Sequence, residues 1–194
     1  MLSIGITGGI GSGKTTVSKI FHYNWNIPVY FADDRAKWFM HNDTETQNFL
    51  LHLFGNDVYK NNELQKKIIA EKIFNDKLIK RKWEQYIHKK VINDYICWRK
   101  DQNFNYHLHE AALIFEAELT NYFDKIILVT SPIELRIKRL QSKGLTKDEA
   151  LLRISNQLSD EEKAKKANFI IYNDEKYSLI EQINLIHKNI TVNL

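Results

Sequence analysis

A glycine-rich loop near the N-terminus constrains the fold of this chain more than any other stretch. The loop has the sequence G-G-I-G-S-G-K-T over residues 8–15 and follows a mainly apolar run, Leu2–Thr7. It matches the phosphate-binding pattern G-x-x-x-x-G-K-[ST] at every position. Val17, Ile20 and Phe21 then follow at helical spacing. The pattern requires a strand before the loop and a helix after it, so we expect the fold to begin with a βα unit.

The residue types of this loop suit one kind of ligand. Glycines allow backbone N–H groups to approach phosphate oxygens that a Cβ would block. Lys14 can reach the β- and γ-phosphates, and the Thr15 hydroxyl can coordinate Mg²⁺. The positive N-terminal end of the following helix attracts the same anion. We therefore expect the loop to bind a nucleoside triphosphate.

Composition narrows the class of protein. The 194 residues suit one domain, and the net charge is 28 − 24 = +4. This mild basicity fits anionic ligands such as nucleotides but is too small to indicate nucleic acid. The single cysteine, Cys97, excludes an intrachain disulfide and a cysteine-based zinc cluster. Because we find neither a signal peptide nor an apolar run of about 18 residues, we expect a cytoplasmic protein without a membrane partner.

An acidic pair follows the second expected strand. Residues 28–31 (P-V-Y-F) suit a short strand, and Asp33 and Asp34 come soon after it. Residues just past the carboxyl ends of parallel strands face the ligand crevice. Asp33 and Asp34 are therefore candidates for a general base or for holding Mg²⁺. The alternative is the acidic first turn of a helix, where Asp is also favoured.

A long helical region, from about Ala36 to Gln102, shows no convincing strand. Its apolar residues share faces at helical spacing, which favours core packing over a platform for stacking bases. These residues are Ile68, Ile69, Ile73 and Phe74 on one face, and Ile79, Trp83, Ile87, Val91, Tyr95 and Trp98 on another. Roughly seventy helical residues exceed what a crossover needs. An insertion that binds a second, anionic substrate would explain them, although the lysines also suit a solvated face.

Three further apolar runs, at residues 106–115, 125–130 and 169–172, indicate the remaining strands. The first run predicts a strand buried on both faces, with Glu116 at its carboxyl end facing the crevice. His107 and His109 share one face of that strand, but without a third ligand we interpret them as structural. The alternation of strands and helices predicts a parallel five-stranded sheet covered by helices on both sides.

A basic segment lies between the last two expected strands. Ser131, Thr146 and Ser159 are each followed three residues later by Glu, which predicts three helix starts. The first two helices would be joined by a short turn that contains Lys143 and Gly144. Such a hairpin could close over phosphates as a lid, with arginines that stabilise the transferred phosphoryl group. The alternative is a charged, solvated hairpin.

These features together favour a small-molecule kinase. Phosphate binding, a helical insertion and a basic lid fit that class better than a motor protein. The chain also contains no N-K-x-D-like segment of the kind that reads guanine, which argues against a GTPase.

Several segments resemble the dephospho-CoA kinase family, and together they extend over nearly the whole chain. They are residues 5–17 (G-I-T-G-G-I-G-S-G-K-T-T-V), Ala32-Asp33 with Ala36, residues 64–74, residues 113–116 (L-I-F-E), Ser131-Pro132, Gln157 and residues 167–173. The resemblance implies an α/β, three-layer P-loop kinase fold with a parallel five-stranded sheet. The nucleotide-binding core would span about 1–35 and 106–194, the helical acceptor-binding insertion about 36–105 and the lid about 136–166.

The resemblance also implies an activity. The family transfers the γ-phosphate of ATP to the ribose 3′-hydroxyl of dephospho-CoA, with Mg²⁺ as cofactor. The residues implied to bind ATP are Gly8, Gly9, Gly11, Ser12, Gly13, Lys14, Thr15, Thr16 and Lys143. Lys14, Asp33 and Arg139 would act in catalysis, and Thr15 and Asp33 would hold the metal. The expected partners are the two small substrates, without nucleic acid, and the chain would be a monomer or a weak homo-oligomer.

Four positions depart from the family pattern. Phe31 replaces the first Asp of a D-A-D motif, His88-Lys89 replaces His-Pro, Ala112 replaces the Pro of P-L-L-F-E, and Lys143 replaces a lid arginine. Phe31 removes a catalytic carboxylate, so Asp33 would have to serve, with or without Asp34. A lysine at 143 lacks the planar fork that binds phosphate at two points.

Two alternatives remain open from the sequence. One is another kinase of the same fold, acting on a nucleotide, shikimate or a sugar acid, because acceptor choice lies in the insertion rather than in the fold. The other is a nucleotide-binding regulatory protein without catalysis, which Phe31 would explain.

Overall fold

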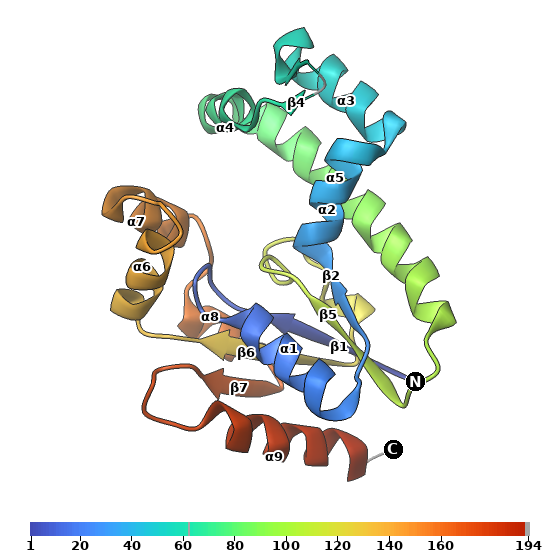
Figure 1. The fold of residues 1–194 in the computed structure, drawn as a ribbon, viewed down its shortest axis with the longest axis vertical. Helices are drawn as coiled ribbons and strands as arrows, with labels where there is room; N and C mark the ends of the chain where they lie inside the picture. The colour runs from blue at the N-terminus through green and yellow to red at the C-terminus, as the bar shows by residue number, and fades with distance from the viewer. Residues whose placement is uncertain (62, 193–194) are drawn as a thin grey trace. The chain divides into compact units, whose positions relative to one another are not determined.

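The chain folds into two compact units. The computed structural model, drawn in Figure 1, describes residues 1–61 and 63–192. One unit joins Met1–Phe31 to the chain from Gln102 onwards, and the other is Ala32–Asp101. We call them the core unit and the helical unit and describe each by itself.

A parallel sheet of five strands forms the centre of the core unit. Its strands are β1 (Leu2–Thr7), β2 (Val29–Phe31), β5 (Tyr106–Glu110), β6 (Lys125–Thr130) and β7 (Phe169–Tyr172). They lie in the order β2-β5-β1-β6-β7, and every neighbouring pair is parallel. The predicted five-stranded parallel sheet is therefore confirmed. Because β1 is central, with later strands on both sides, its carboxyl end is where such a sheet binds ligands.

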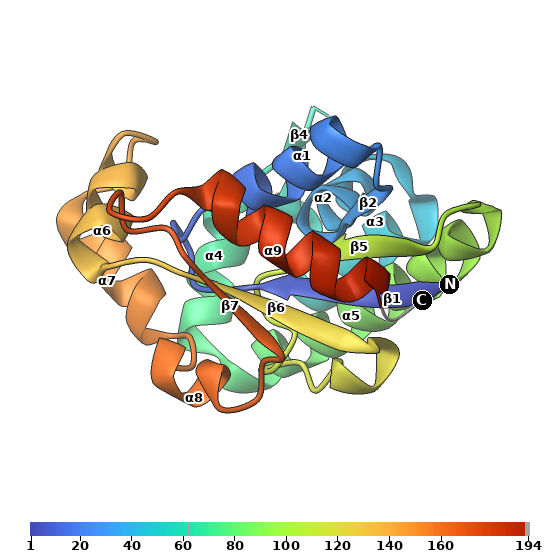
Figure 2. The ribbon, with the colours of Figure 1, turned by 90° about the horizontal axis from the view of Figure 1, so that it is seen from below.

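Helices cover both faces of this sheet. Figure 2 shows α1 (Lys14–Trp25) and α9 (Leu179–Val192) over one face and α8 (Asp160–Ala164) beyond the other. Between β6 and β7 lie α6 (Ile133–Gln141) and α7 (Lys147–Ser155). The main hydrophobic cluster fills the face under α1 and α9, and its fully buried members include Ile4, Ile6, Val17, Phe21, Leu108, Ile127 and Ile183. This packing fixes the start of α1 relative to the end of β1.

Strand β5 is shorter than predicted: it ends at Glu110 rather than Phe115. Glu110 pairs with Ile6 of β1 on one side and with Phe31, the last residue of β2, on the other. Beyond this point β2 offers no further backbone partners and β1 continues for one residue only. The chain therefore leaves the sheet, and the Ala111 N–H donates to the Ile6 carbonyl oxygen at 3.0 Å.

The helical unit contains α2 (Ala32–Asn42), α3 (Thr44–Phe54), α4 (Lys66–Asn75) and α5 (Lys77–Trp98). A small antiparallel hairpin of β3 (Tyr59–Lys60) and β4 (Glu63–Leu64) lies between α3 and α4. The prediction of a region without strands was wrong at this hairpin, because two-residue strands are too short to show an alternating pattern. Short 3₁₀ turns occur at Asn56–Val58, Arg99–Asp101 and, in the core unit, Thr120–Tyr122.

The long helix α5 organises the helical unit. It begins after Asp76, whose side chain accepts hydrogen bonds from the backbone N–H groups of Leu78 and Ile79. Its predicted apolar face is buried at Trp83, Ile87, Val91 and Tyr95, which confirms core packing for these aromatic residues. On α4, Ile69 is buried as expected, but Phe74 is 70% exposed. No helix in residues 1–61 and 63–192 has the length and apolar character needed to cross a membrane.

Candidate active site

The loop between β1 and α1 has a backbone that requires glycine at several positions. Gly8, Gly11 and Gly13 have φ values of 152°, 78° and 100°, which side-chain-bearing residues rarely adopt. A Cβ on Gly8 would overlap the Val129 carbonyl oxygen, and a Cβ on Gly13 would overlap the side-chain amide of Asn173. The loop therefore forms a cradle of backbone groups with little space for side chains.

Lys14 and Ser12 are buried in this cradle. The Lys14 side chain donates through Nζ to the carbonyl oxygens of Gly8 at 3.1 Å and Gly9 at 3.4 Å. The Ser12 hydroxyl is fully buried and lacks a hydrogen-bond partner within the part of the chain that the structure describes. A buried ammonium group, an unsatisfied hydroxyl and the N-terminal end of α1 together fit a phosphate chain.

Thr15 contacts a carboxylate that reasoning from the sequence did not identify. Its hydroxyl donates to Oε1 of Glu110 at 3.1 Å. Thr15 lies in the first turn of α1, next to the exposed Thr16, whereas Glu110 is the last residue of β5 and is only 6% exposed. A hydroxyl beside a carboxylate provides oxygen ligands of the kind that Mg²⁺ prefers. In residues 1–61 and 63–192 no group of three His, Cys, Asp or Glu could hold a metal by itself.

Arg139, the arginine of the predicted lid that was assigned to catalysis, contacts the loop. Its guanidinium group donates to the carbonyl oxygens of Gly11 and Ser12 at 3.4 Å each, and to the Ser131 hydroxyl at 3.1 Å. Asn173 approaches the same place, since its side-chain amide donates to the Ser12 carbonyl oxygen at 2.7 Å. Arg139 and Asn173, from α6 and the end of β7, thus converge on the loop just before α1.

The starts of the three helices between β6 and β7 differ from the prediction at one position. Ser131 does not cap α6, because Pro132 occupies the N-cap position and makes no side-chain capping bond; the Ser131 hydroxyl accepts from Arg139 instead. The capping boxes at Thr146 and Ser159 are confirmed. Lys143 is exposed in the turn between α6 and α7.

Asp33 and Asp34 occupy the first turn of α2, in the helical unit, and both are exposed. Asp34 forms an ion pair with Lys37 at 2.7 Å. Within this unit, burial lowers the pKa of His88, while the negative charges of Glu84 and Asp33 act in the opposite direction. The pair therefore lies in the acidic first turn of a helix, as in the alternative that the sequence left open. The catalytic role of Asp33 stays a prediction.

Glu116 does not end a strand, contrary to prediction. Its Oε1 lies 2.7 Å from Nζ of Lys163, which is fully buried, and it accepts a hydrogen bond from the Leu158 N–H at 3.1 Å. Glu116 therefore attaches α8 and the segment before it to the turns that follow β5.

His107 and His109 are buried in β5. The His109 ring stacks on Tyr30 at a centroid distance of 5.2 Å and contacts Phe123 at 5.0 Å. Burial, with a smaller contribution from His107, lowers the pKa of His109 to about 3, so its ring is neutral at pH 7. These contacts support the structural interpretation of the pair.

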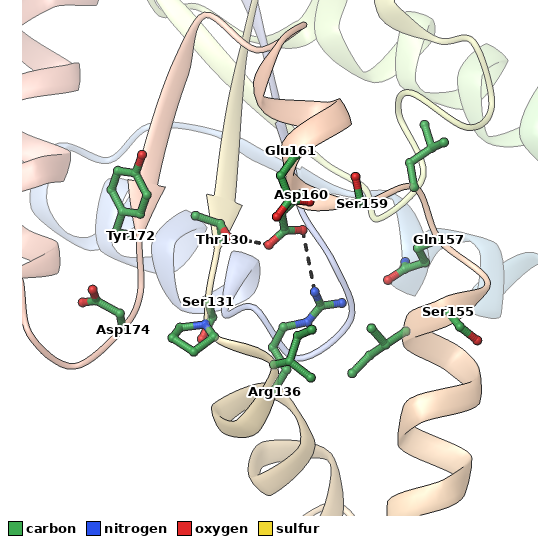
Figure 3. Close-up of a pocket in the computed structure, with 14 residues that line it drawn as sticks. Thr130, Ser131, Arg136, Ser155, Gln157, Ser159, Asp160, Glu161, Tyr172 and Asp174 are labelled. Carbon is green, nitrogen blue, oxygen red and sulfur yellow. Dashed lines mark hydrogen bonds and ion pairs between the residues drawn. The ribbon is translucent and has the colours of Figure 1, made fainter.

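A cavity of about 490 Å³ lies beside α6 and the segment between α7 and α8 (Figure 3). It is lined by Thr130, Ser131, Pro132, Ile133, Arg136, Ile154, Ser155, Gln157, Leu158, Ser159, Asp160, Glu161, Tyr172 and Asp174. Its central interaction is an ion pair between Arg136 and Asp160, with NH1 and Oδ1 3.6 Å apart, and the Thr130 hydroxyl donates to the same carboxylate. Burial lowers the pKa of Arg136, and Asp160 partly offsets that effect.

The sequence matches the family model described as dephospho-CoA kinase over residues 2–178. The chain belongs to the dephospho-CoA kinase family. A relative from Bacteroides fragilis named dephospho-CoA kinase is 32% identical over 184 residues, covering 94% of this chain and 89% of the relative. Another, from Listeria innocua, is 34% identical over 179 residues, covering 89% of this chain and 88% of the relative. The enzyme class predicted from the sequence, a kinase, is thereby confirmed.

Solved structures agree with this assignment. A protein from Thermus thermophilus superposes with a TM-score of 0.85 at 27% identity, covering 100% of this chain and 97% of that one. Dephospho-CoA kinase from Campylobacter jejuni superposes with a TM-score of 0.66 at 27% identity, covering 99% and 98%. A shikimate kinase from Bacteroides thetaiotaomicron, at 16% identity and a TM-score of 0.55, shares the fold alone. The predicted P-loop kinase fold is confirmed.

Proposed function

We propose that this chain transfers the γ-phosphate of ATP to the ribose 3′-hydroxyl of dephospho-CoA and so forms coenzyme A. The observation that carries the proposal is the family match, which includes both units almost completely. The geometry of the β1–α1 loop supports the ATP half of the reaction. The individual roles below are inferred from the described contacts.

The loop and Lys14 would hold the triphosphate. Backbone N–H groups of the loop, other than those of Ile10 and Ser12, which have partners within the protein, and the start of α1 are suited to the phosphate oxygens. Nζ of Lys14 lies inside the same cradle, where it would neutralise charge on the β- and γ-phosphates. The unsatisfied Ser12 hydroxyl would supply a further donor.

Thr15 and Glu110 would hold Mg²⁺ together with phosphate oxygens. When bound, this metal neutralises charge on the triphosphate. The Thr15 hydroxyl is suited to direct coordination, and the Glu110 carboxylate, 3.1 Å from that hydroxyl, would orient it or accept from metal-bound water. We therefore propose Glu110 as a residue of the metal site in addition to Asp33, which the resemblance to the family assigned to the metal.

Asp33 would act as the general base. The acceptor oxygen forms a bond to the γ-phosphorus, the bond from that phosphorus to the departing ADP oxygen breaks, and the hydroxyl proton passes to the Asp33 carboxylate. Phe31 ends β2 beside Glu110 in the sheet register, so the carboxylate at this edge of the sheet comes from β5 rather than from β2.

Arg139 would stabilise charge that develops on the transferred phosphoryl group. Its guanidinium contacts the loop carbonyls of Gly11 and Ser12, and its charged N–H donors are suited to phosphate oxygens held by that loop. Lys143, in the turn of the lid at about 136–166, would add a second positive charge.

The helical unit would bind dephospho-CoA. The units of the structure, Ala32–Asp101 and the rest, fall within a few residues of the division proposed from the sequence, with an insertion at about 36–105. We place the activity in the cytoplasm and take the active form to be a monomer or a weak homo-oligomer, with ATP and dephospho-CoA as its partners.

An acceptor panel tests the proposal. The purified chain would be incubated with ATP, Mg²⁺ and, separately, dephospho-CoA, shikimate, gluconate and nucleoside monophosphates, with ADP release as the readout. We expect turnover with dephospho-CoA alone. Turnover with another acceptor would show a different kinase of the same fold, and ATP binding without turnover on any acceptor would show a regulatory protein.

A further inference from the structure

Both backbone hydrogen-bonding groups of one residue in the ATP loop, Ile10, are bound by side chains from the segment between β6 and β7. The Ile10 N–H donates to Oε1 of Gln157 at 2.8 Å, and the Ile10 carbonyl oxygen accepts from Nε of Arg136 at 2.9 Å. These partners come from α6 and from the connection between α7 and α8. The N–H and carbonyl of Ile10 are therefore committed to the protein.

Arg136 is held firmly in place by its surroundings. The side chain is 5% exposed, and its NH1 group faces Asp160, which also accepts from Thr130. A Cβ on Gly9 would overlap the Arg136 guanidinium group, so the loop backbone lies directly against it. Figure 3 shows the guanidinium directed at Asp160 across the cavity.

Gln157 is positioned in a similar way by the backbone that follows it. The next N–H, of Leu158, donates to Glu116, which is paired with the buried Lys163. Ser159 then caps α8. The backbone that follows Gln157 is thus attached through Leu158 to Glu116 and through Asp160 to Arg136 and Thr130, which holds Gln157 near Ile10.

We propose that Arg136 and Gln157 are positioning residues for the ATP phosphates: by binding the N–H and the carbonyl oxygen of Ile10, which belong to two successive peptides, they hold the neighbouring glycine amides toward the triphosphate. The sequence did not assign a role in binding or catalysis to either residue. External partners on the two peptides that meet at Ile10 reduce the freedom of both to flip, which keeps the neighbouring glycine N–H groups available to phosphate oxygens. Only the kinetic readout of this inference rests on the proposed function.

Arg136 allows a sharp test because glutamine carries a nitrogen at the same place along its side chain as Nε of arginine. Arg136→Gln keeps a donor for the Ile10 carbonyl and removes the charge that faces Asp160. Arg136→Met keeps the length and removes both. Gln157→Leu removes the acceptor for the Ile10 N–H. Lys138→Met, on the exposed side of the same helix, is the matched control.

The kinetic measurement is kcat and KM for each substrate. We expect Arg136→Met and Gln157→Leu to lower kcat/KM for ATP by about 10- to 100-fold, as for a buried group left unpaired, and to leave KM for dephospho-CoA unchanged. Arg136→Gln should stay within about threefold of the wild type, since it retains the neutral hydrogen bond. If Arg136→Gln loses as much as Arg136→Met, or if KM for both substrates rises equally, the positioning role is wrong.

Amide hydrogen exchange by NMR gives a readout that does not depend on turnover. Gln157→Leu should accelerate exchange of the Ile10 amide without changing the amides of β6, and it should weaken binding of a fluorescent ATP analogue. Unchanged Ile10 exchange and unchanged analogue affinity would overturn the inference even if the chain proved to act on another acceptor. Should Arg136→Met fail to fold, Gln157→Leu against the wild type decides the question by the same two readouts.

Discussion

Replacing Glu110 by glutamine tests the metal-binding half of the proposed mechanism. Glutamine has nearly the same shape and can still accept from the Thr15 hydroxyl, which lies 3.1 Å from the carboxylate. The substitution therefore removes the charge of a side chain that is 6% exposed while leaving its packing intact.

The size of the effect follows from that contact. A hydrogen bond to a charged group contributes about 1.5–3 kcal/mol and a neutral one about 0.5–1.5 kcal/mol. The loss of about 1–2 kcal/mol corresponds to a fall of about 5- to 30-fold in kcat/KM. Because the carboxylate would also attract the cation, we expect the half-saturating Mg²⁺ concentration to rise.

The assay is ADP release with dephospho-CoA over a Mg²⁺ titration, with the melting temperature measured in parallel. Glu118→Gln is the control, because Glu118 is an exposed residue in the turns that follow the same strand. A variant at Glu110 with the wild-type Mg²⁺ dependence and wild-type kcat/KM would refute the assignment.

Three further changes have defined outcomes. Asp33→Asn should keep ATP affinity and lose about 100-fold or more in kcat, as expected for a general base. Turnover at the wild-type rate would show that Asp33 is not the general base. Lys163→Met leaves the Glu116 carboxylate without its buried partner, and should lower the free energy of unfolding by about 3–5 kcal/mol in a urea titration. Hydrogen bonds from the backbone and then the side chain of Ser159 lower the pKa of Glu162 below its ordinary value. The stabilisation by Glu162 is therefore present above that ordinary pKa and is lost as the pH falls through the lowered pKa. Glu162→Gln should therefore reduce the melting temperature at pH 7 and lose that effect once the pH lies below the lowered pKa of Glu162, and an equal reduction at every pH would contradict the capping role.

The fold was largely predictable because its strands are short apolar runs with clear ends. Leu2–Thr7 and Lys125–Thr130 match the expected strands, and the loop after β1 has a sequence pattern with a single structural interpretation. The end of β5 was not predictable in the same way. The apolar run continues to Phe115, and only the pairing of Glu110 with the last residue of β2 shows where the strand stops.

The residues of the ATP-binding loop were predictable from the sequence, whereas the prediction missed several residues that contact the loop. Lys14 and Thr15 belong to a motif, whereas Glu110 lies within the run 106–115, which predicted a strand that continues past it to Phe115. Arg136 and Gln157 contact the loop from about 120 to 150 residues away in sequence, and no local pattern encodes such contacts. Of these residues, only Glu110 had a signal in the sequence: it is a polar residue at the end of a buried strand, where side chains reach the edge of the sheet that binds ligands.

The central claim is the transfer of phosphate to one hydroxyl of dephospho-CoA. The most direct measurement is ³¹P NMR of the product formed from ATP, Mg²⁺ and dephospho-CoA by the purified chain, with ADP measured in the same sample. We expect a new phosphomonoester resonance on the ribose 3′-oxygen, formed in equal amount to ADP and absent with Lys14→Met. ADP release without that resonance, or no reaction at micromolar enzyme, would contradict the claim.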